Sequence, residues 1–144
     1  MALVAPEGPV YQAGTLSGHP LAMAAGVATL ARLAPGDYAA LETRVERLAA
    51  ALSAAGKAAS RDVAVARCGP LLTLFFLPEL PRNGAAALLA DREAYARFFT
   101  AMLERGVLLP PSQFEAWFPG FAHGDAEIDA IANAAAESLA EMAR

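Results

Sequence analysis

The sequence predicts a small α+β domain, in which a short and mainly antiparallel sheet is covered by helices. Apolar residues recur at helical spacing in four segments, and two short runs of β-branched and large apolar residues lie between them. The expected order along the chain is helix, helix, strand, strand, helix, strand, helix. A chain of 144 residues is long enough to bury one core of this kind.

The N-terminal segment is predicted to be a loop followed by a helix. Residues 1–18 are rich in Pro, Gly and small residues and show no lasting period, which is typical of an extended loop. Pro20 suits the first position of a helix, since its missing N–H would have no partner within the helix there. We therefore expect a helix over 21–33, ended by Pro35-Gly36.

A second helix and a hairpin are expected next. Asp37 suits the N-cap of a helix that ends near Gly56. Apolar residues spaced by four, three and four predict its buried face, which consists of Leu41, Val45, Leu48 and Leu52. Strands are predicted over 63–67 and 71–77, and the short connection between them favours an antiparallel pair. The second strand is apolar on both faces and should lie centrally in the sheet.

The C-terminal part is predicted to hold a loop over 78–84, two helices and one further strand. Asp91 should cap a helix that stops at Gly106, with an inward face of Tyr95, Phe98, Met102 and Leu103. A short strand is expected over 107–109, before Pro110-Pro111. The last helix should start at Asp125, with a buried face of Ile128, Ile131, Ala135, Leu139 and Met142.

Composition and charge exclude several classes of protein. The net charge is −4 and the arginines are scattered singly, which argues against nucleic acid as a partner. Prolines and glycines interrupt the longest uncharged stretch, so we expect no membrane span. No positively charged segment precedes that stretch, so we expect no signal peptide either. The single cysteine, Cys68, excludes an internal disulfide or a cysteine metal site and fits a reducing cytoplasm. We expect its side chain to be a small core residue beside a strand.

One candidate site is the loop that leads into the first helix, Tyr11-Gln12-Ala13-Gly14-Thr15-Leu16-Ser17-Gly18-His19-Pro20. Glycines let main-chain N–H groups approach an anion, hydroxyl groups add donors, and the dipole of the following helix favours negative charge. These features predict a phosphate site. The alternative interpretation is a tight turn with ordinary capping hydroxyl groups.

A second candidate lies in Leu109-Pro110-Pro111-Ser112-Gln113-Phe114-Glu115-Ala116-Trp117-Phe118. Glu115 stands among aromatic residues, where burial would raise the pKa of a carboxylate or require a cationic partner. The alternative is a solvent-facing residue on a folded-back loop. We interpret His19 and His123 as structural or exposed, and Lys57 as a cation at a helix end, so no metal site is expected.

Two strings in the sequence resemble the C-terminal third of glutamate-1-semialdehyde 2,1-aminomutases, which are related to class III aminotransferases. They are VYQAGTLSGHPLAMAAGVATL and YARFFTAMLERGVLLPPSQFEAWF, followed by a terminal amphipathic helix. The resemblance implies the small C-terminal domain of a fold-type I transferase that uses pyridoxal 5′-phosphate. Segment 1–35 would then be a phosphate-contact loop and connecting helix from the end of the large domain, and 36–144 the small domain.

The resemblance also implies roles for individual residues. Gly14 and Thr15 would contact the cofactor phosphate of the other subunit in a homodimer, and Tyr11 would lie beside the same site. Glu115 would lie near the cofactor and discriminate against the substrates of ordinary transaminases. The family more often has Asn in place of His19, and Asn would be the better helix cap.

The resemblance implies a cytoplasmic enzyme that converts glutamate-1-semialdehyde, a small molecule, to 5-aminolevulinate in tetrapyrrole (porphyrin) biosynthesis. The Schiff-base lysine and the acidic partner of the pyridine nitrogen lie upstream of the first motif in the family. We therefore interpret the chain as a C-terminal fragment that is inactive alone and binds no cofactor by itself. The alternatives are a fragment of another class III aminotransferase and a stand-alone α+β interaction module without catalysis.

Overall fold

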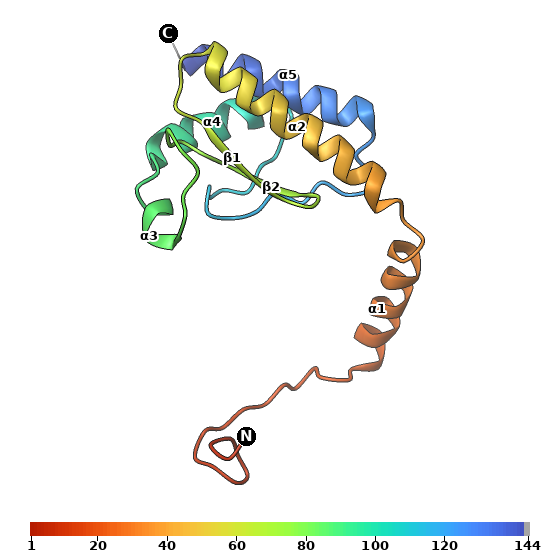
Figure 1. Ribbon diagram of the computed structural model, residues 1–144. Helices are drawn as coiled ribbons and strands as arrows, with labels where there is room; N and C mark the ends of the chain where they lie inside the picture. Colours follow the sequence, from red (N-terminus) through yellow and green to blue (C-terminus); the bar gives the residue numbers. More distant parts are fainter. Residues whose placement is uncertain (143–144) are drawn as a thin grey trace. The chain divides into compact units, whose positions relative to one another are not determined.

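The computed structural model describes residues 1–142, which divide into two compact units, Met1–Gly36 and a unit that begins at Asp37. In the first unit, turns and loops over residues 1–18 precede helix α1 (Pro20–Leu33), labelled in Figure 1. The expected helix is confirmed, and Pro20 is its first residue. His19 occupies the N-cap position without a side-chain hydrogen bond, and no residue of α1 is buried.

The second unit contains the α+β domain that the sequence predicts. Its elements in chain order are α2 (Tyr38–Ala58), β1 (Ala64–Cys68), β2 (Leu71–Phe75), α3 (Gly84–Ala87), α4 (Arg92–Glu104) and α5 (Asp125–Met142). Helices α2 and α5 run side by side, and the hairpin of β1 and β2 lies against this helical layer (Figure 1). Among residues 1–142, no helix is both long and apolar enough to cross a membrane.

Helix α2 forms as its sequence predicts, although it extends two residues beyond Gly56. The carboxylate of Asp37 accepts a hydrogen bond of 2.9 Å from the N–H of Ala40, which caps the first turn. All four residues of the predicted face are buried: Leu41, Val45, Leu48 and Leu52.

The two expected strands form an antiparallel hairpin, in which Ala64 lies opposite Phe75 and Cys68 opposite Leu71. On its other edge β2 makes one antiparallel bridge, between Leu72 and Trp117. The prediction for the Cys68 side chain is wrong, because Cys68 ends β1 beside the turn and is exposed.

The predicted strand over 107–109 is also wrong. These residues are irregular, because the free edge of β2 is occupied by Trp117 and the N–H of Val107 turns back to the carbonyl of Met102. The short helix α3, which begins at the last residue of the predicted loop, was not expected from the sequence. Its N-cap is Asn83, whose side chain accepts a hydrogen bond of 2.9 Å from the N–H of Ala86.

Helix α4 begins after Asp91, whose carboxylate accepts a hydrogen bond of 2.9 Å from the N–H of Ala94. The predicted inward residues Tyr95, Phe98 and Met102 are buried, but Leu103 is 48% exposed. Leu103 lies one position past the buried stripe, where the helix has turned toward solvent.

Helix α5 completes the core against α2 and α4. Of its predicted face, Ile128, Ala135 and Leu139 are fully buried, and Ile131 and Met142 pack partly buried against the core. At the surface, Arg47 of α2 forms ion pairs with Asp125 and Asp129 of α5, at 2.9 and 3.0 Å. Since these pairs are exposed, the apolar contacts supply most of the stability of the helix pair.

Candidate functional site

The segment 109–118, here named the anchored loop, follows α4 and returns the chain to β2. The main chain of Trp117 pairs with that of Leu72: the N–H of Trp117 donates to the carbonyl of Leu72 at 2.7 Å, and the reverse bond is 3.4 Å long. At the other end of the loop, the Tyr95 hydroxyl of α4 donates a hydrogen bond of 2.7 Å to the carbonyl of Pro110. The loop is thus fixed both to the sheet and to α4.

Gln113 lies in the middle of the anchored loop and is 2% exposed, although glutamine is usually a surface residue. Its Oε1 accepts a hydrogen bond from the N–H of Phe76, and its Nε2 donates to the carbonyl of Asp91, both at 3.2 Å. Its main-chain carbonyl accepts from the hydroxyl of Thr73 at 3.1 Å. Its burial is not predicted from the sequence, in which the only signal is an amide among aromatic residues after a rigid Pro-Pro.

Glu115 occupies the part of the anchored loop that faces solvent. Its N–H donates a hydrogen bond of 3.1 Å to the carbonyl of Ser112, which forms a turn, and its side chain is exposed. The carboxylate is therefore not enclosed by Phe114, Trp117 and Phe118 in this structure. Trp117 turns into the core, whereas Phe114 and Phe118 are 43% and 71% exposed. The solvent-facing alternative describes the geometry.

Charged and polar side chains nevertheless lie near Glu115 in the structure. The Arg92 guanidinium lies over the ring of Phe114, with its Cζ atom 5.4 Å from the ring centroid. Burial raises the pKa of Tyr95 to about 12; the nearby Trp117 indole N–H opposes the rise, and the Glu115 carboxylate adds to it. That indole N–H is buried without a hydrogen-bond partner among residues 1–142, so it influences the Tyr95 hydroxyl without bonding to it.

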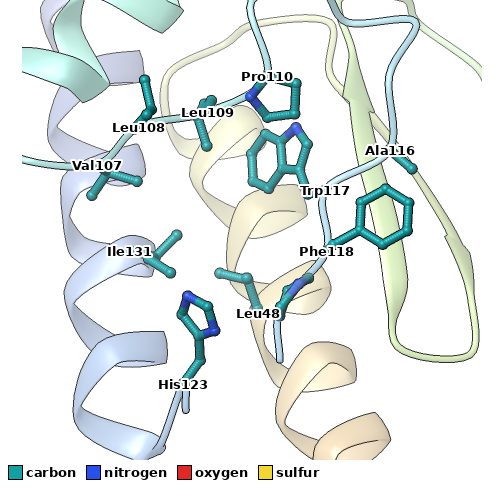
Figure 2. A pocket seen from close by; sticks show the side chains of 11 residues that line it. Leu48, Val107, Leu108, Leu109, Pro110, Ala116, Trp117, Phe118, His123 and Ile131 are labelled. Carbon is teal, nitrogen blue, oxygen red and sulfur yellow. The ribbon is translucent and has the colours of Figure 1, made fainter. Parts of the chain in front are cut away.

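Two of the cavities beside the anchored loop are lined by its aromatic residues. The smaller, of about 140 Å³, is lined by Arg92, Tyr95, Ser112 and Phe114 among others. The larger, of about 350 Å³, is mostly apolar, and Figure 2 shows the Trp117 ring and the His123 imidazole among its walls. His123 is structural, as expected, because its Nδ1 accepts a hydrogen bond of 3.0 Å from the N–H of Gly120.

The first candidate loop lies in the other unit, where Tyr11, Gly14 and Thr15 are all exposed. It forms two turns, in which the N–H of Ser17 donates to the carbonyl of Gly14 at 2.9 Å and the N–H of His19 to that of Leu16 at 3.1 Å. A Cβ atom at Gly14 would lie 2.4 Å from the Ser17 Oγ atom, a contact that rotation of the Ser17 side chain would relieve, so the turn itself does not require glycine there.

The residues of this loop can contact a phosphate but do not enclose one. The N–H groups of Ser17 and His19 are already used by the turns, while the Thr15 hydroxyl is at the surface. A phosphate at this loop would therefore stay open to solvent and to further ligands from elsewhere. Lys57, the single lysine of the chain, is exposed in the last turn of α2. Within residues 1–142, no three His, Cys, Asp or Glu residues gather as they would around a metal ion.

Comparisons with known proteins identify relatives of this chain. No family model matches the chain. Glutamate-1-semialdehyde 2,1-aminomutase from Desulforudis audaxviator is 50% identical over 140 residues, which cover 96% of this chain and 32% of the relative. The aminomutases of the same name from Desulfatibacillum aliphaticivorans and Thermomicrobium roseum are 46% and 47% identical over 99% and 100% of the chain, which correspond to 34% of each relative.

A solved structure supports the fold. The crystal structure of an omega-transaminase from Sphaerobacter thermophilus matches 94% of this chain and 32% of its own, with a TM-score of 0.74 and 23% identity. At that identity the likeness shows the fold alone. The chain spans about a third of the length of the curated relatives that it matches. It is homologous, along nearly all of its length, to the C-terminal part of the glutamate-1-semialdehyde 2,1-aminomutases.

Proposed function

We propose that this chain supplies the C-terminal part of an enzyme that converts glutamate-1-semialdehyde to 5-aminolevulinate by moving an amino group within one substrate. The observation that carries the proposal is the identity of 46–50% to three aminomutases over 96–100% of the chain. The names of these relatives state the substrate and the reaction class. The anchored loop and the Gly14-Thr15 turn are the two segments through which the chain would take part.

In the proposed enzyme, pyridoxal 5′-phosphate supplies the aldehyde chemistry that carries the amino group. The phosphate would be bound mainly by the other subunit of a homodimer. The Thr15 hydroxyl would donate a hydrogen bond to it, and Gly14 would let the main chain approach it closely. The exposure of both residues supports a contact made across an interface. Tyr11 would lie beside the same phosphate.

Glu115 would act as a specificity residue on the anchored loop. Its exposed carboxylate would repel the carboxylate of an external 2-oxo acid, which an ordinary transaminase must bind. A neutral or cationic side chain at this position would lower that repulsion. Glu115 would thus favour return of the amino group to the same substrate.

The chain alone should be inactive, because its single lysine, Lys57, is exposed in the last turn of α2 and lies in neither candidate segment. Pyridoxal 5′-phosphate mixed with the chain should show only weak reaction with Lys57 or the N-terminus. Stoichiometric, borohydride-trappable binding together with aminomutase turnover would contradict this part of the proposal.

The proposal is tested by joining this chain to the remaining two thirds of the Desulforudis audaxviator aminomutase, in place of the segment that it matches. The joined protein should form 5-aminolevulinate from glutamate-1-semialdehyde when supplied with the cofactor. The unaltered relative is the positive control. A folded, dimeric joined protein that binds the cofactor but forms no 5-aminolevulinate would overturn the proposed function.

A further inference from the structure

Three hydrogen bonds close a ring among Phe76, Asp91 and Gln113. The N–H of Phe76 donates to Gln113 Oε1, Gln113 Nε2 donates to the carbonyl of Asp91, and the N–H of Asp91 donates to the carbonyl of Phe76, each at 3.2 Å. Only one orientation of the carboxamide satisfies both neighbours, because one offers a donor and the other an acceptor. The ring joins the residue after β2, the N-cap of α4 and the anchored loop.

The same residue stands close to Glu115 along the chain. Gln113 is 2% exposed and Trp117 is 5% exposed, and they lie before and after Glu115 in the chain. Each has its own hydrogen bonds to β2: the Gln113 carbonyl to the Thr73 hydroxyl, and the Trp117 main chain to that of Leu72. Between these two buried anchors, the main chain of Glu115 is held by its bond to Ser112, while its side chain points to solvent.

We propose that Gln113 is a positioning residue for Glu115: its buried carboxamide fixes the anchored loop so that the Glu115 carboxylate is presented on the solvent face in one arrangement. The inference rests on the specificity role of Glu115 proposed above. A carboxylate on a mobile loop would lose part of its discrimination, since each ordering of the loop on binding costs conformational entropy. A buried polar side chain that satisfies two main-chain groups removes that mobility before a substrate arrives.

Two variants of the full chain separate hydrogen bonding from packing. Gln113→Met keeps the length of the side chain and loses both hydrogen bonds. Gln113→Glu keeps the acceptor for Phe76, but its second oxygen can donate to the Asp91 carbonyl only when the carboxyl group is protonated. Burial should raise the pKa of this introduced group, so the defect should be smallest at low pH and grow as pH rises through that pKa.

Amide hydrogen exchange measures the positioning directly. In Gln113→Met, we expect exchange at Phe76, Glu115 and Trp117 to be about tenfold faster, because their local opening no longer breaks two hydrogen bonds. Amides in the middle of α2 should keep their rates relative to the native chain. For Gln113→Glu, the exchange rate of each loop amide is divided by its rate in the native chain at the same pH. This ratio should approach one at low pH and increase with pH. Gln113→Met carries the same Asp91, Arg92 and Glu115 groups and should lack this trend, which makes it the matched control.

Unchanged exchange at Glu115 and Trp117 in Gln113→Met would overturn the inference. Equal acceleration in the loop and in α2 would also overturn it, because Gln113 would then serve global stability alone. If Gln113→Met does not fold, the pH trend of exchange in Gln113→Glu tests the inference instead. Absence of that trend would likewise refute the positioning role.

The joined protein supplies a second readout. There, Gln113→Met should reproduce the loss of discrimination against 2-oxo acids that Glu115→Gln causes, while Glu115→Gln leaves loop exchange at the native rate. Full discrimination in a Gln113→Met protein with a loosened loop would refute the positioning role. Absence of turnover in the native joined protein would instead refute the proposed function, and the exchange experiment on the chain would still decide whether Gln113 orders the loop.

Discussion

The hydroxyl group of Tyr95 in α4 donates a hydrogen bond of 2.7 Å to the main-chain carbonyl of Pro110. The Tyr95 side chain is buried, and the bond holds the start of the anchored loop against the helix. Through this bond, α4 determines where the anchored loop begins. The helix itself is recognisable from its periodicity, whereas the loop is irregular. The consequence is that the loop of the candidate site should depend on residues of α4.

Tyr95→Phe removes this bond and leaves the ring in place. We expect the free energy of unfolding to fall by about 1 kcal/mol, since the carbonyl of the partly buried Pro110 loses its donor. The emission of Trp117, the single tryptophan, should also change because its indole lies next to the lost hydroxyl. Urea unfolding followed by Trp117 fluorescence measures both effects. Tyr38→Phe is the matched control, because Tyr38 is 50% exposed and its ring contact with Phe121 is retained; equal effects of the two substitutions would contradict the assignment.

The raised pKa of Tyr95 predicts a loss of stability in alkali. The pKa in the folded chain is about 12, above the ordinary value of 10.0, so the folded state disfavours the charged form. The contribution of Tyr95 to stability is therefore fully present below pH 10 and is lost as pH rises toward 12. Tyrosinate absorbance should show a late-titrating group that disappears in Tyr95→Phe.

The same titration reports on the distance between Tyr95 and Glu115. Because the Glu115 carboxylate adds to the rise, Glu115→Gln should lower the pKa of Tyr95. An unchanged late titration in Glu115→Gln would show that the loop does not hold the carboxylate near the hydroxyl.

Much of this fold is readable from the sequence because its helices carry local signals. Asp37 and Asp91 cap helices, and the buried stripes of α2, α4 and α5 follow helical spacing, so these elements need no distant partner to be recognised. The two-stranded hairpin is equally local, since a turn of two residues joins its strands.

The wrong predictions concern residues whose conformation is determined by contacts with distant parts of the chain. Residues 107–109 have the composition of a strand, but Trp117 takes the edge of β2 that such a strand would need. Gln113 is buried because two segments distant from it in the sequence offer it partners: Thr73 and Phe76 at β2, and Asp91 before α4. Glu115 is exposed because the aromatic residues near it in sequence point in different directions. None of these outcomes follows from a local pattern.

Thr15→Ala tests the phosphate contact in the joined protein. If the hydroxyl donates to the cofactor phosphate of the partner subunit, its removal should weaken cofactor binding by about 1.5–3 kcal/mol, roughly ten- to a hundredfold in Kd. The fold should persist, because Thr15 is exposed in its own unit. Thr29→Ala is the control, since the Thr29 hydroxyl bonds only to the Ala25 carbonyl of α1. Equal cofactor affinity in both variants would show that the Gly14-Thr15 turn is merely structural.

The partition of the amino group between two products in the joined protein is the sharpest test of the role of Glu115. Glutamate-1-semialdehyde is supplied together with an external 2-oxo acid, and 5-aminolevulinate is measured against the amino acid formed from the competitor. With Glu115 present, nearly all product should be 5-aminolevulinate. Glu115→Gln should slow its formation and raise the competing product, whereas Glu104→Gln, a change to an exposed carboxylate of α4, should alter neither. An unchanged partition in a folded Glu115→Gln protein would contradict the account, because the anchored loop would then select no substrate.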